Sequence, residues 1–399
     1  MIGAGLIGLA SAWRAAQRGL SVLVVDRAPV PGAGASHAAA GMLAPVTEAD
    51  FGEERLLRVN LAAREPVAGA SGVAAGMLAP VTEADFGEEG PLRLNLAGRD
   101  RWPAFAAELE EVSGLPTGYR DSGALVVAAD RDDAEALHRL HDFQRQLGLE
   151  TEWLTPSLCR RLEPGLSPRI AGGILAPQDG SAEPGATAAA LSTVVEEMAL
   201  GVEVEAIESD GGRVTGVRTS AGPIACERVV VAAGAWSAAL APGDGPPVRP
   251  VKGQILELRV RGEMPDPVER LIRTPRCYLV ARSGGRVVLG ATVEEQGFDT
   301  AVTADGVFRL LEAAWEVLPE IGELELVRAR AGLRPGTPDN APIVGPGEPG
   351  GLVWATGHWR NGVLLAPLTG EAVAGVLAGE SLPDELAALA PDRFAGARA

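Results

Sequence analysis

The apolar and polar positions of this chain follow a helical period in some stretches and a strand pattern in others. Helices are expected over residues 6–18, 101–114, 132–147, 183–200, 304–318 and about 362–377. Strands are expected over residues 21–26, 122–128, 202–207, 214–219, 227–233, 254–260, 277–282, 286–291 and 352–356. Strands near both ends alternate with helices, whereas the strands from 277 to 291 follow one another through a glycine turn. The pattern therefore predicts an α/β protein with a parallel, Rossmann-like sheet and a separate antiparallel sheet.

Three glycines at the start of the chain add chemistry to this pattern. Gly3, Gly5 and Gly8 form G-x-G-x-x-G directly before the first helix, and the strand after that helix ends in Asp26. Glycines in this arrangement let the backbone turn tightly and approach a pyrophosphate, to which the helix N-terminus offers free N–H groups. The acid accepts hydrogen bonds from a ribose diol. This stretch therefore predicts a dinucleotide-binding site.

The first strand of that fingerprint is short. Only Met1 and Ile2 precede Gly3, where the fingerprint has the central strand of the parallel sheet. We expect weaker stability and weaker cofactor retention, unless another segment fills the slot.

One segment near the N-terminus is written twice. AAGMLAPVTEADFGEE occupies residues 39–54 and again 74–89, and the likeness extends over 31–64 and 66–99 at a constant offset of 35 residues. Two copies are too few for a repeat array, which needs about three or more units. A tandem insertion is the simpler explanation, in which one copy enters the fold and about 35 residues form a surface excursion. Such an insertion is tolerated because loop-closure entropy grows slowly with length.

Composition narrows the class of partner. The 399 residues include 53 acidic and 35 basic side chains, and the net charge of −18 disfavours nucleic acid. No apolar run reaches the roughly 18 residues of a membrane span, and no signal peptide is expected.

The three scattered cysteines suit a reducing compartment, so we expect a cytoplasmic protein. His138 and His141 lie on a polar helix, where a solvated surface is more typical than a metal site.

Eight stretches together carry a resemblance to a known family. They are GAGLIGLASA, SHAAAGML, VVVAAGAWS, PVKGQ, CYLVAR, VVLGAT, AGLRPGTPDNAPIVG and GHWRNGVLLAPLTG. In this order, and over nearly the whole chain, they resemble the FAD-dependent D-amino-acid oxidase superfamily, most closely the glycine oxidases of thiamine biosynthesis. The resemblance implies a discontinuous FAD-binding domain (residues 1–100, 180–246 and 335–399) and an antiparallel substrate-binding domain (101–179 and 247–334).

The resemblance also implies a reaction. Hydride passes from the α-carbon of a small amino acid to non-covalent FAD, and O₂ is then reduced to hydrogen peroxide. The imine product is hydrolysed, to glyoxylate when the substrate is glycine, or enters thiazole synthesis for thiamine. This chemistry needs no metal ion, because the protein only has to orient the substrate and stabilise charge on the flavin.

Particular residues receive roles from the resemblance. Arg334 is expected to clamp the substrate carboxylate, Tyr278 to add a hydroxyl group, and Arg360 to lie near the same carboxylate. The expected cofactor contacts are Gly3, Gly5, Gly8, Asp26, Arg27, Ser36, Ala40, Gly41, Met42, Val204, Gly234, His358, Arg360, Asn361, Gly362, Val363 and Leu364.

The repeat leaves a choice of register at the flavin. The first copy lies at the family's distance after Asp26, so Ser36, Ala40, Gly41 and Met42 are the expected contacts. The competing register puts Gly76 and Met77 there instead.

Other functions stay open at this point. Sarcosine, D-proline or a larger D-amino acid could be the substrate, and the family's tendency to form tetramers suggests a homotetramer. A catalytically defective relic would fit the short first strand and the duplication. A nicotinamide-dependent dehydrogenase would share the glycine fingerprint, but it does not account for GHWRNGVLLAP near the C-terminus.

Overall fold

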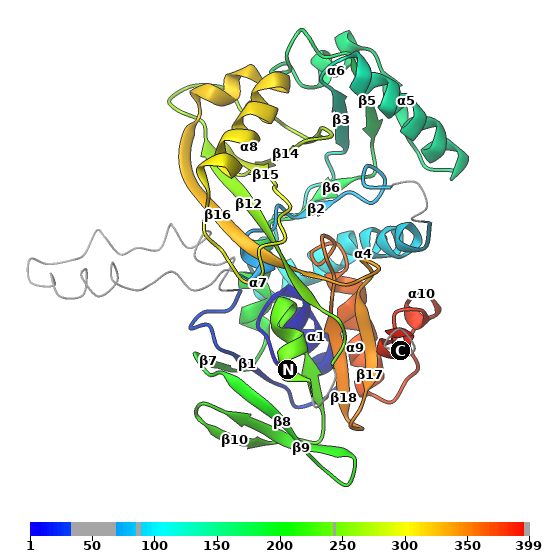
Figure 1. The fold of residues 1–399 in the computed structure, drawn as a ribbon, viewed down its shortest axis with the longest axis vertical. Helices are drawn as coiled ribbons and strands as arrows, with labels where there is room; N and C mark the ends of the chain where they lie inside the picture. The colour runs from blue at the N-terminus through cyan, green and yellow to red at the C-terminus, as the bar shows by residue number, and fades with distance from the viewer. Residues whose placement is uncertain (33–68, 85–88, 242–244, 395–399) are drawn as a thin grey trace, which may run out of the picture.

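The computed structural model describes residues 1–32, 69–84, 89–241 and 245–394. Its two main sheets lie in the lower and upper halves of the molecule as drawn in Figure 1. The helices are α1 (Leu6–Gln17), η1 (Ala70–Gly72), α4 (Glu89–Ser113), α5 (Arg131–Gln146), α6 (Pro156–Leu162), α7 (Pro184–Val194), η2 (Gly234–Leu240), α8 (Ala304–Val317), η3 (Pro319–Glu323), α9 (Ala366–Leu377), α10 (Asp384–Ala387) and η4 (Pro391–Phe394). The strands are β1 (Leu23–Asp26), β2 (Met77–Leu78), β3 (Ala124–Ala128), β4 (Glu152–Leu154), β5 (Gly172–Ala176), β6 (Gly180–Ser181), β7 (Glu197–Leu200), β8 (Val204–Asp210), β9 (Arg213–Thr219), β10 (Gly222–Ala225), β11 (Val229–Val231), β12 (Arg249–Arg259), β13 (Leu271–Arg273), β14 (Tyr278–Arg282), β15 (Arg286–Gly290), β16 (Glu325–Gly336), β17 (Ile343–Gly347) and β18 (Leu352–Thr356).

The lower sheet is the expected Rossmann-like one. Strand β1 pairs in parallel with β7, β11 pairs in parallel with β18, and β17 adds an antiparallel edge. Helices α1 and α9 pack so closely that a Cβ on Gly370 would lie 2.9 Å from the carbonyl oxygen of Ala10. This close approach leaves no room for a side chain at position 370.

A single residue joins the two halves of the lower sheet. Ile2 bridges to Val25 on one side and to Val231 on the other, so it occupies the central slot that a full strand would fill. The ammonium group of Met1 donates to the carbonyl oxygen of Leu23 at 2.8 Å, and burial lowers its pKa to about 6. The expected loss of stability from this short slot stays a prediction.

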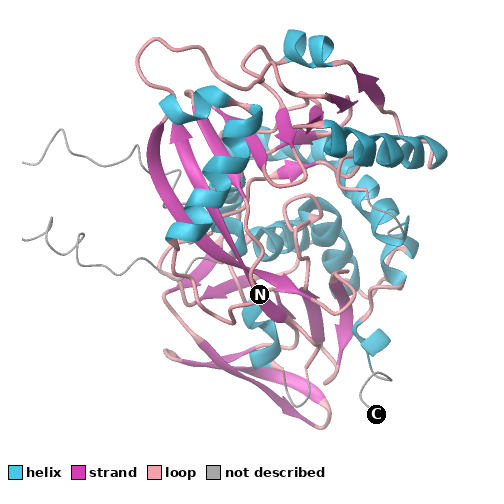
Figure 2. Ribbon diagram, turned by 45° about the horizontal axis from the view of Figure 1, so that its top comes forward, coloured by secondary structure: helices cyan, strands magenta, loops and turns pink. Residues whose placement is uncertain are grey.

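The upper sheet has eight strands in the order β16-β12-β15-β14-β13-β3-β5-β4. Its neighbours are antiparallel except for β13 and β3, which run in parallel. Helix α8 covers one face, where Leu310 and Val317 join the buried cluster that contains Leu256 and Leu289 (Figure 2). The antiparallel sheet expected from the sequence is therefore present. The boundaries expected for the two domains stay a prediction.

Residues 69–84, in the second copy of the repeat, lie between the two sheets. Gly69 bridges in parallel to Leu333 of the upper sheet, and β2 pairs with β6. The hydroxyl oxygen of Ser71 accepts the backbone N–H of Leu6 in α1 at 3.4 Å. The guanidinium of Arg282 donates to the carbonyl oxygen of Ala75 from the upper sheet. This segment therefore contacts both halves of the molecule.

Three of the expected helices have other bounds in the structure. The helix expected over 183–200 ends at Val194, because Glu197–Leu200 pairs with β1 and completes the lower sheet as β7. The helix expected from about 362 begins at Ala366, with a proline in its first turn. The helix expected over 101–114 begins earlier, at Glu89, and has Pro103 inside it.

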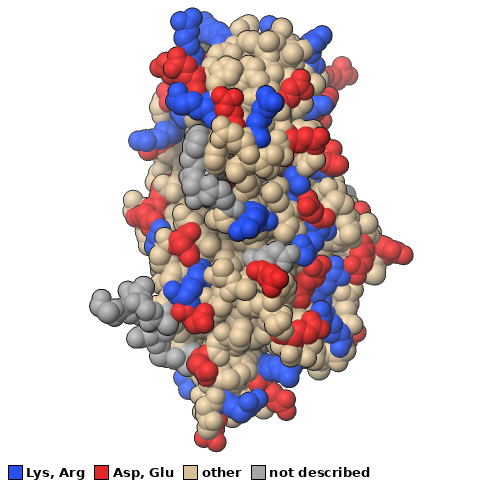
Figure 3. All heavy atoms as spheres, turned by 90° about the vertical axis from the view of Figure 1, so that its right-hand side faces the viewer, with Lys and Arg blue, Asp and Glu red and all other residues tan. Residues whose placement is uncertain are grey.

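Acidic and basic side chains are interspersed over the face of the molecule that Figure 3 shows, without a continuous basic band on that face. In the described part of the chain, no helix combines the length and the apolar character needed to cross a bilayer. His138 stacks on Trp153, with ring centroids 3.6 Å apart.

Candidate active site

One cavity of about 700 Å³ connects the lower sheet to the upper sheet. Its walls come from the glycine turn before α1, the ends of β1 and β18, residues of segment 69–84, and strands β13 to β16. The residues expected to contact a cofactor or substrate that line it are Gly3, Gly5, Asp26, Arg27, Val204, Gly234, Tyr278, Arg334, His358, Arg360, Gly362 and Val363. Segments far apart in the sequence thus meet around one space.

The three fingerprint glycines do different work. Gly3 has a φ of +110°, and a Cβ there would lie 2.4 Å from the carbonyl oxygen of Ala232. Gly8 packs on this turn, since its Cβ would come within 1.9 Å of the carbonyl oxygen of Gly3. Gly5 faces the cavity, where its nearest neighbour is the Ser71 hydroxyl oxygen, 3.3 Å from the added Cβ. The first and third glycines therefore shape the turn, and the second leaves the space beside it open.

Asp26 and Arg27 stand at the end of the cavity near the lower sheet. The Asp26 carboxylate accepts the backbone N–H groups of Ala4 at 2.6 Å and Ala28 at 2.8 Å. These bonds fix the carboxylate beside the glycine turn. The guanidinium carbon of Arg27 lies 4.1 Å from the ring centroid of Trp236, which also lines the cavity.

Residues from the second copy of the repeat form part of the cavity wall. Ser71, Ala74, Ala75, Gly76 and Met77 line the cavity, and these correspond to the register that the sequence left as the alternative. Gly76 has a φ of +65°, and a Cβ there would lie 1.9 Å from the carbonyl oxygen of Ala182, so no other residue fits. The first-copy residues Ser36, Ala40, Gly41 and Met42 lie outside the described residues.

Arg334 and Tyr278 meet at the upper end of the cavity. The Arg334 Nη1 donates to the carbonyl oxygens of Thr292 at 3.0 Å and Lys252 at 3.4 Å, and its guanidinium shares a hydrogen bond with the Tyr278 hydroxyl. Burial lowers the pKa of Arg334 and raises that of Tyr278. Within the described residues no carboxylate forms an ion pair with Arg334, so its buried positive charge faces the cavity.

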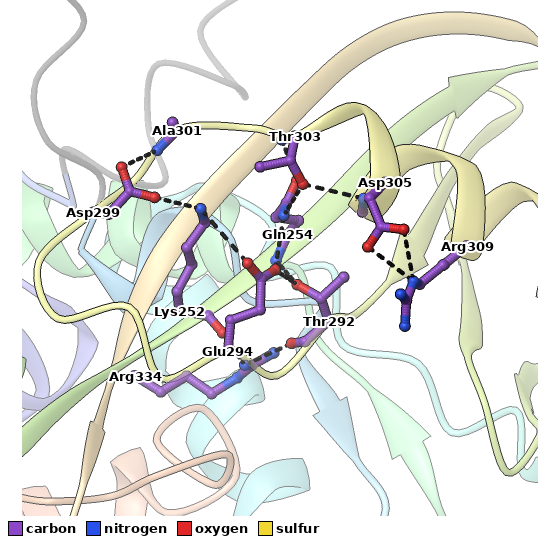
Figure 4. A network of polar contacts seen from close by, with 11 residues as sticks. Lys252, Gln254, Thr292, Glu294, Asp299, Ala301, Thr303, Asp305, Arg309 and Arg334 are labelled. Carbon is purple, nitrogen blue, oxygen red and sulfur yellow. Dashed lines mark hydrogen bonds and ion pairs between the residues drawn. The ribbon is translucent and has the colours of Figure 1, made fainter.

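A polar network behind Arg334 holds its two carbonyl acceptors in place (Figure 4). The fully buried ammonium of Lys252 pairs with Asp299 at 2.6 Å and with Glu294 at 3.7 Å. Glu294 also accepts the Thr292 hydroxyl at 2.5 Å. Because Lys252 and Thr292 both contact the Glu294 carboxylate, the two carbonyl oxygens that bind Arg334 are held together.

The segment before α9 closes the cavity floor. His358 is buried, its Nε2 lies 3.0 Å from the Thr369 hydroxyl oxygen, and burial lowers its pKa to about 3. It is therefore neutral at physiological pH. Asn361 and Leu364 were expected at the cofactor but are not among the lining residues. The Leu364 carbonyl oxygen instead accepts the indole N–H of Trp102 at 3.1 Å.

Several lining residues escaped the sequence analysis. Arg273 and Glu83 line the cavity, and Gly253 and Gly290 lie beneath the clamp. Arg273 is the direct cross-strand partner of Tyr278. If residues 273–278 (RTPRCY) had been interpreted as the turn of a β-hairpin, Arg273 and Tyr278 would have been predicted side by side. No strand was predicted at β13, so this pairing was missed.

The cavity fits a flavin dinucleotide. A helix N-terminus and a glycine turn for a pyrophosphate lie near one end, beside the Asp26 carboxylate for a ribose. At the other end lies the buried Arg334 guanidinium, which has no carboxylate partner among the described residues and could bind an anionic group. The space between them is continuous, so one ligand can reach from the fingerprint to the clamp.

Comparisons with known proteins agree with this geometry. A family model described as FAD dependent oxidoreductase matches residues 1–65 and 53–376, and the two matches overlap inside the repeated region. The glycine oxidase of Geobacillus kaustophilus is 33% identical over 405 residues, covering 99% of this chain and 97% of that protein. The crystal structure of a glycine oxidase from Geobacillus kaustophilus superposes on this structure with a TM-score of 0.83. The two sequences are 31% identical, and the match covers 98% of this chain and 97% of that chain.

A third relative is longer than this chain. The bifunctional protein ThiO/ThiG of Synechocystis sp. is 33% identical over 402 residues, which cover 99% of this chain and 53% of that protein. The chain thus spans about half the length of its bifunctional relatives.

Proposed function

Because the chain belongs to the FAD-dependent oxidoreductase family, we propose that it oxidises glycine and other small amino acids at the α-carbon. The cofactor is FAD, and the class of reaction is amine oxidation. The proposal concerns which amine is the substrate.

One observation carries the choice of an amino acid. Arg334 is a buried guanidinium that donates to two carbonyl oxygens and to no described carboxylate, beside the Tyr278 hydroxyl. A planar guanidinium and a phenol match the two oxygens of a substrate carboxylate. A simple amine without a carboxylate would leave this charge uncompensated.

The chain's own residues then determine the course of the reaction. Arg334 and Tyr278 hold the carboxylate, so the α-carbon is directed along the cavity towards the space between them and the glycine turn. Arg360 adds a second positive charge to the same cavity, which favours anionic groups there. The neutral His358 adds none, since its pKa is about 3.

FAD supplies the hydride acceptor when it is bound. The balanced reaction proposed for glycine consumes O₂ and water and gives glyoxylate, ammonia and hydrogen peroxide. We further propose non-covalent attachment of FAD and a role of the imine in thiazole synthesis. The similarity to ThiO/ThiG supports that role.

A peroxide-release assay tests the proposal. Purified protein supplemented with FAD is given glycine, sarcosine, D-alanine and D-proline, and peroxide is measured with each. Oxidation of glycine at a rate comparable to or above the others is the expected result. Bleaching of a bound flavin by none of the four would contradict the proposal, whereas a clear preference for sarcosine or D-proline would redirect it.

A further inference from the structure

Arg273 occupies a position beside the clamp that the reaction on glycine does not use. It lies directly across the β13–β14 pair from Tyr278, so both side chains emerge on one face of the sheet. Both residues line the cavity. The charge of Arg273 also affects the pKa of Tyr278, so the guanidinium lies near that hydroxyl.

The substrate end of the cavity carries more positive charge than glycine requires. Four arginines line it, namely Arg273, Arg276, Arg334 and Arg360, and among the described residues at this end Glu83 is the one acidic residue. Arg276 is paired outside the cavity with Glu316 of α8. The remaining positive charges favour an anionic ligand with more than one negative group.

The contacts of Arg273 leave it able to receive such a group. Its Nη1 donates to the carbonyl oxygen of Thr82 at 2.6 Å, which fixes the guanidinium at the wall. Its Nη2 lies 3.7 Å from the Glu83 carboxylate, beyond hydrogen-bond distance. Arg273 and Glu83 therefore form an ion pair without a hydrogen bond, so the Nη2 hydrogens can still donate to a ligand.

We propose that Arg273 forms a second carboxylate subsite, so that the enzyme accepts amino dicarboxylates in which the first carboxylate is held by Arg334 and Tyr278. Directly opposite residues in a strand pair have Cβ atoms about 4.5–5.5 Å apart, which matches carboxylates separated by two or three atoms. This inference rests on the proposed amine oxidation, because it uses the same clamp.

Sarcosine and iminodiacetate make a matched test. Both are N-substituted glycines with the same reacting carbon, and they differ by one carboxylate. The ratio of kcat/KM for iminodiacetate to that for sarcosine is measured with FAD-loaded wild-type protein and with Arg273→Met. We expect Arg273→Met to lower this ratio about tenfold or more, as loss of a charge-assisted hydrogen bond would. Arg273→Lys, which keeps the charge, should restore part of it.

Arg276→Met is the control, since Arg276 lines the same cavity but is paired with Glu316. Its ratio should stay within about twofold of the wild-type value. An equal fall in both variants, or an unchanged ratio in Arg273→Met, overturns the subsite.

Ligand binding provides a readout independent of turnover. Succinate, whose carboxylates are separated by two carbons, and acetate are titrated while the flavin absorbance is followed, and Arg273→Met should weaken succinate far more than acetate. Equal weakening overturns the subsite. If no amine is oxidised by the wild-type protein but succinate still binds through Arg273, the proposed function fails and the subsite stands.

Discussion

The hydroxyl oxygen of Tyr278 lies over Gly290, so close that a Cβ added to the glycine would come within 2.5 Å of it. The two residues are direct partners in the β14–β15 pair. Gly253 makes room for Arg334 in the same way, with a distance of 2.4 Å between the added Cβ and Nη1. The positions of the Arg334 and Tyr278 side chains therefore depend on two glycines that leave room for them.

Gly290→Ala should displace the Tyr278 hydroxyl and weaken substrate binding. We expect the KM for glycine to rise about tenfold, with a stability loss within the 1–3 kcal/mol typical of overpacking. Steady-state kinetics and urea unfolding measure the two effects. Gly322→Ala is the matched control, because an added Cβ at Gly322 meets nothing within 4 Å. A KM unchanged in Gly290→Ala would show that the hydroxyl does not hold the substrate.

Arg334→Met should abolish the carboxylate clamp. Truncating one partner of a buried charge pair costs about 2–5 kcal/mol, so kcat/KM for glycine should fall by a factor of about 30 or more. Arg334→Lys keeps the charge but not the planar fork, and it should restore only part of the loss. FAD content is measured alongside as the control. Normal kinetics with glycine in Arg334→Met would rule out this clamp.

Asp179 should make stability depend on pH. Its buried carboxylate accepts the backbone N–H groups of Val81 at 3.2 Å and Thr82 at 2.8 Å, behind the turn that carries Glu83. Burial raises its pKa to about 6, against the opposing effects of these hydrogen bonds and of Arg99.

A raised carboxyl pKa means that the folded state binds the proton more tightly than the unfolded state. The contribution of Asp179 to stability is therefore full below about pH 4 and is lost as the pH rises through about 6. The shift corresponds to up to about 3 kcal/mol. In Asp179→Asn, the free energy of unfolding should lose this part of its pH dependence between pH 4 and 8. Parallel pH curves for the two proteins would contradict the assignment.

The two copies of the repeat should respond differently to substitution. Met77 lines the cavity, so Met77→Arg should lower FAD affinity at least tenfold in a titration of the apoprotein. Met42→Arg is the matched change in the other copy, and it should leave the affinity within about threefold. Deleting residues 34–68 removes one repeat unit and keeps the described lining residues, so the shortened protein should bind FAD. The reverse ranking of the two Met variants would support the first-copy register.

The sequence predicted those parts of the fold where local pattern and chemistry coincide. The glycine turn, the helix after it and the strand that ends in Asp26 follow from spacing alone, and the structure confirms them. The antiparallel strands around Tyr278 followed from alternation and from a glycine turn. Family membership, the fold class and FAD were likewise predicted and confirmed.

Other features depend on partners that are remote in sequence. Glu197–Leu200 looked helical, yet it becomes β7 because β1 offers an edge to pair with. No strand was predicted around Arg334, yet this residue lies in a twelve-residue strand paired along β12. The register of the repeat could not be read from composition, because the identical segments differ only in what surrounds them.

The segment of residues 69–84 has a thermodynamic consequence. It accepts a hydrogen bond from Arg282 in the upper sheet, and its Ser71 accepts one from α1 in the lower half. Calorimetry should therefore record one melting transition for both halves. Since a ligand of the native state stabilises everything that unfolds with it, loss of FAD should lower the melting temperature of the distant helix α8 as much as that of α1.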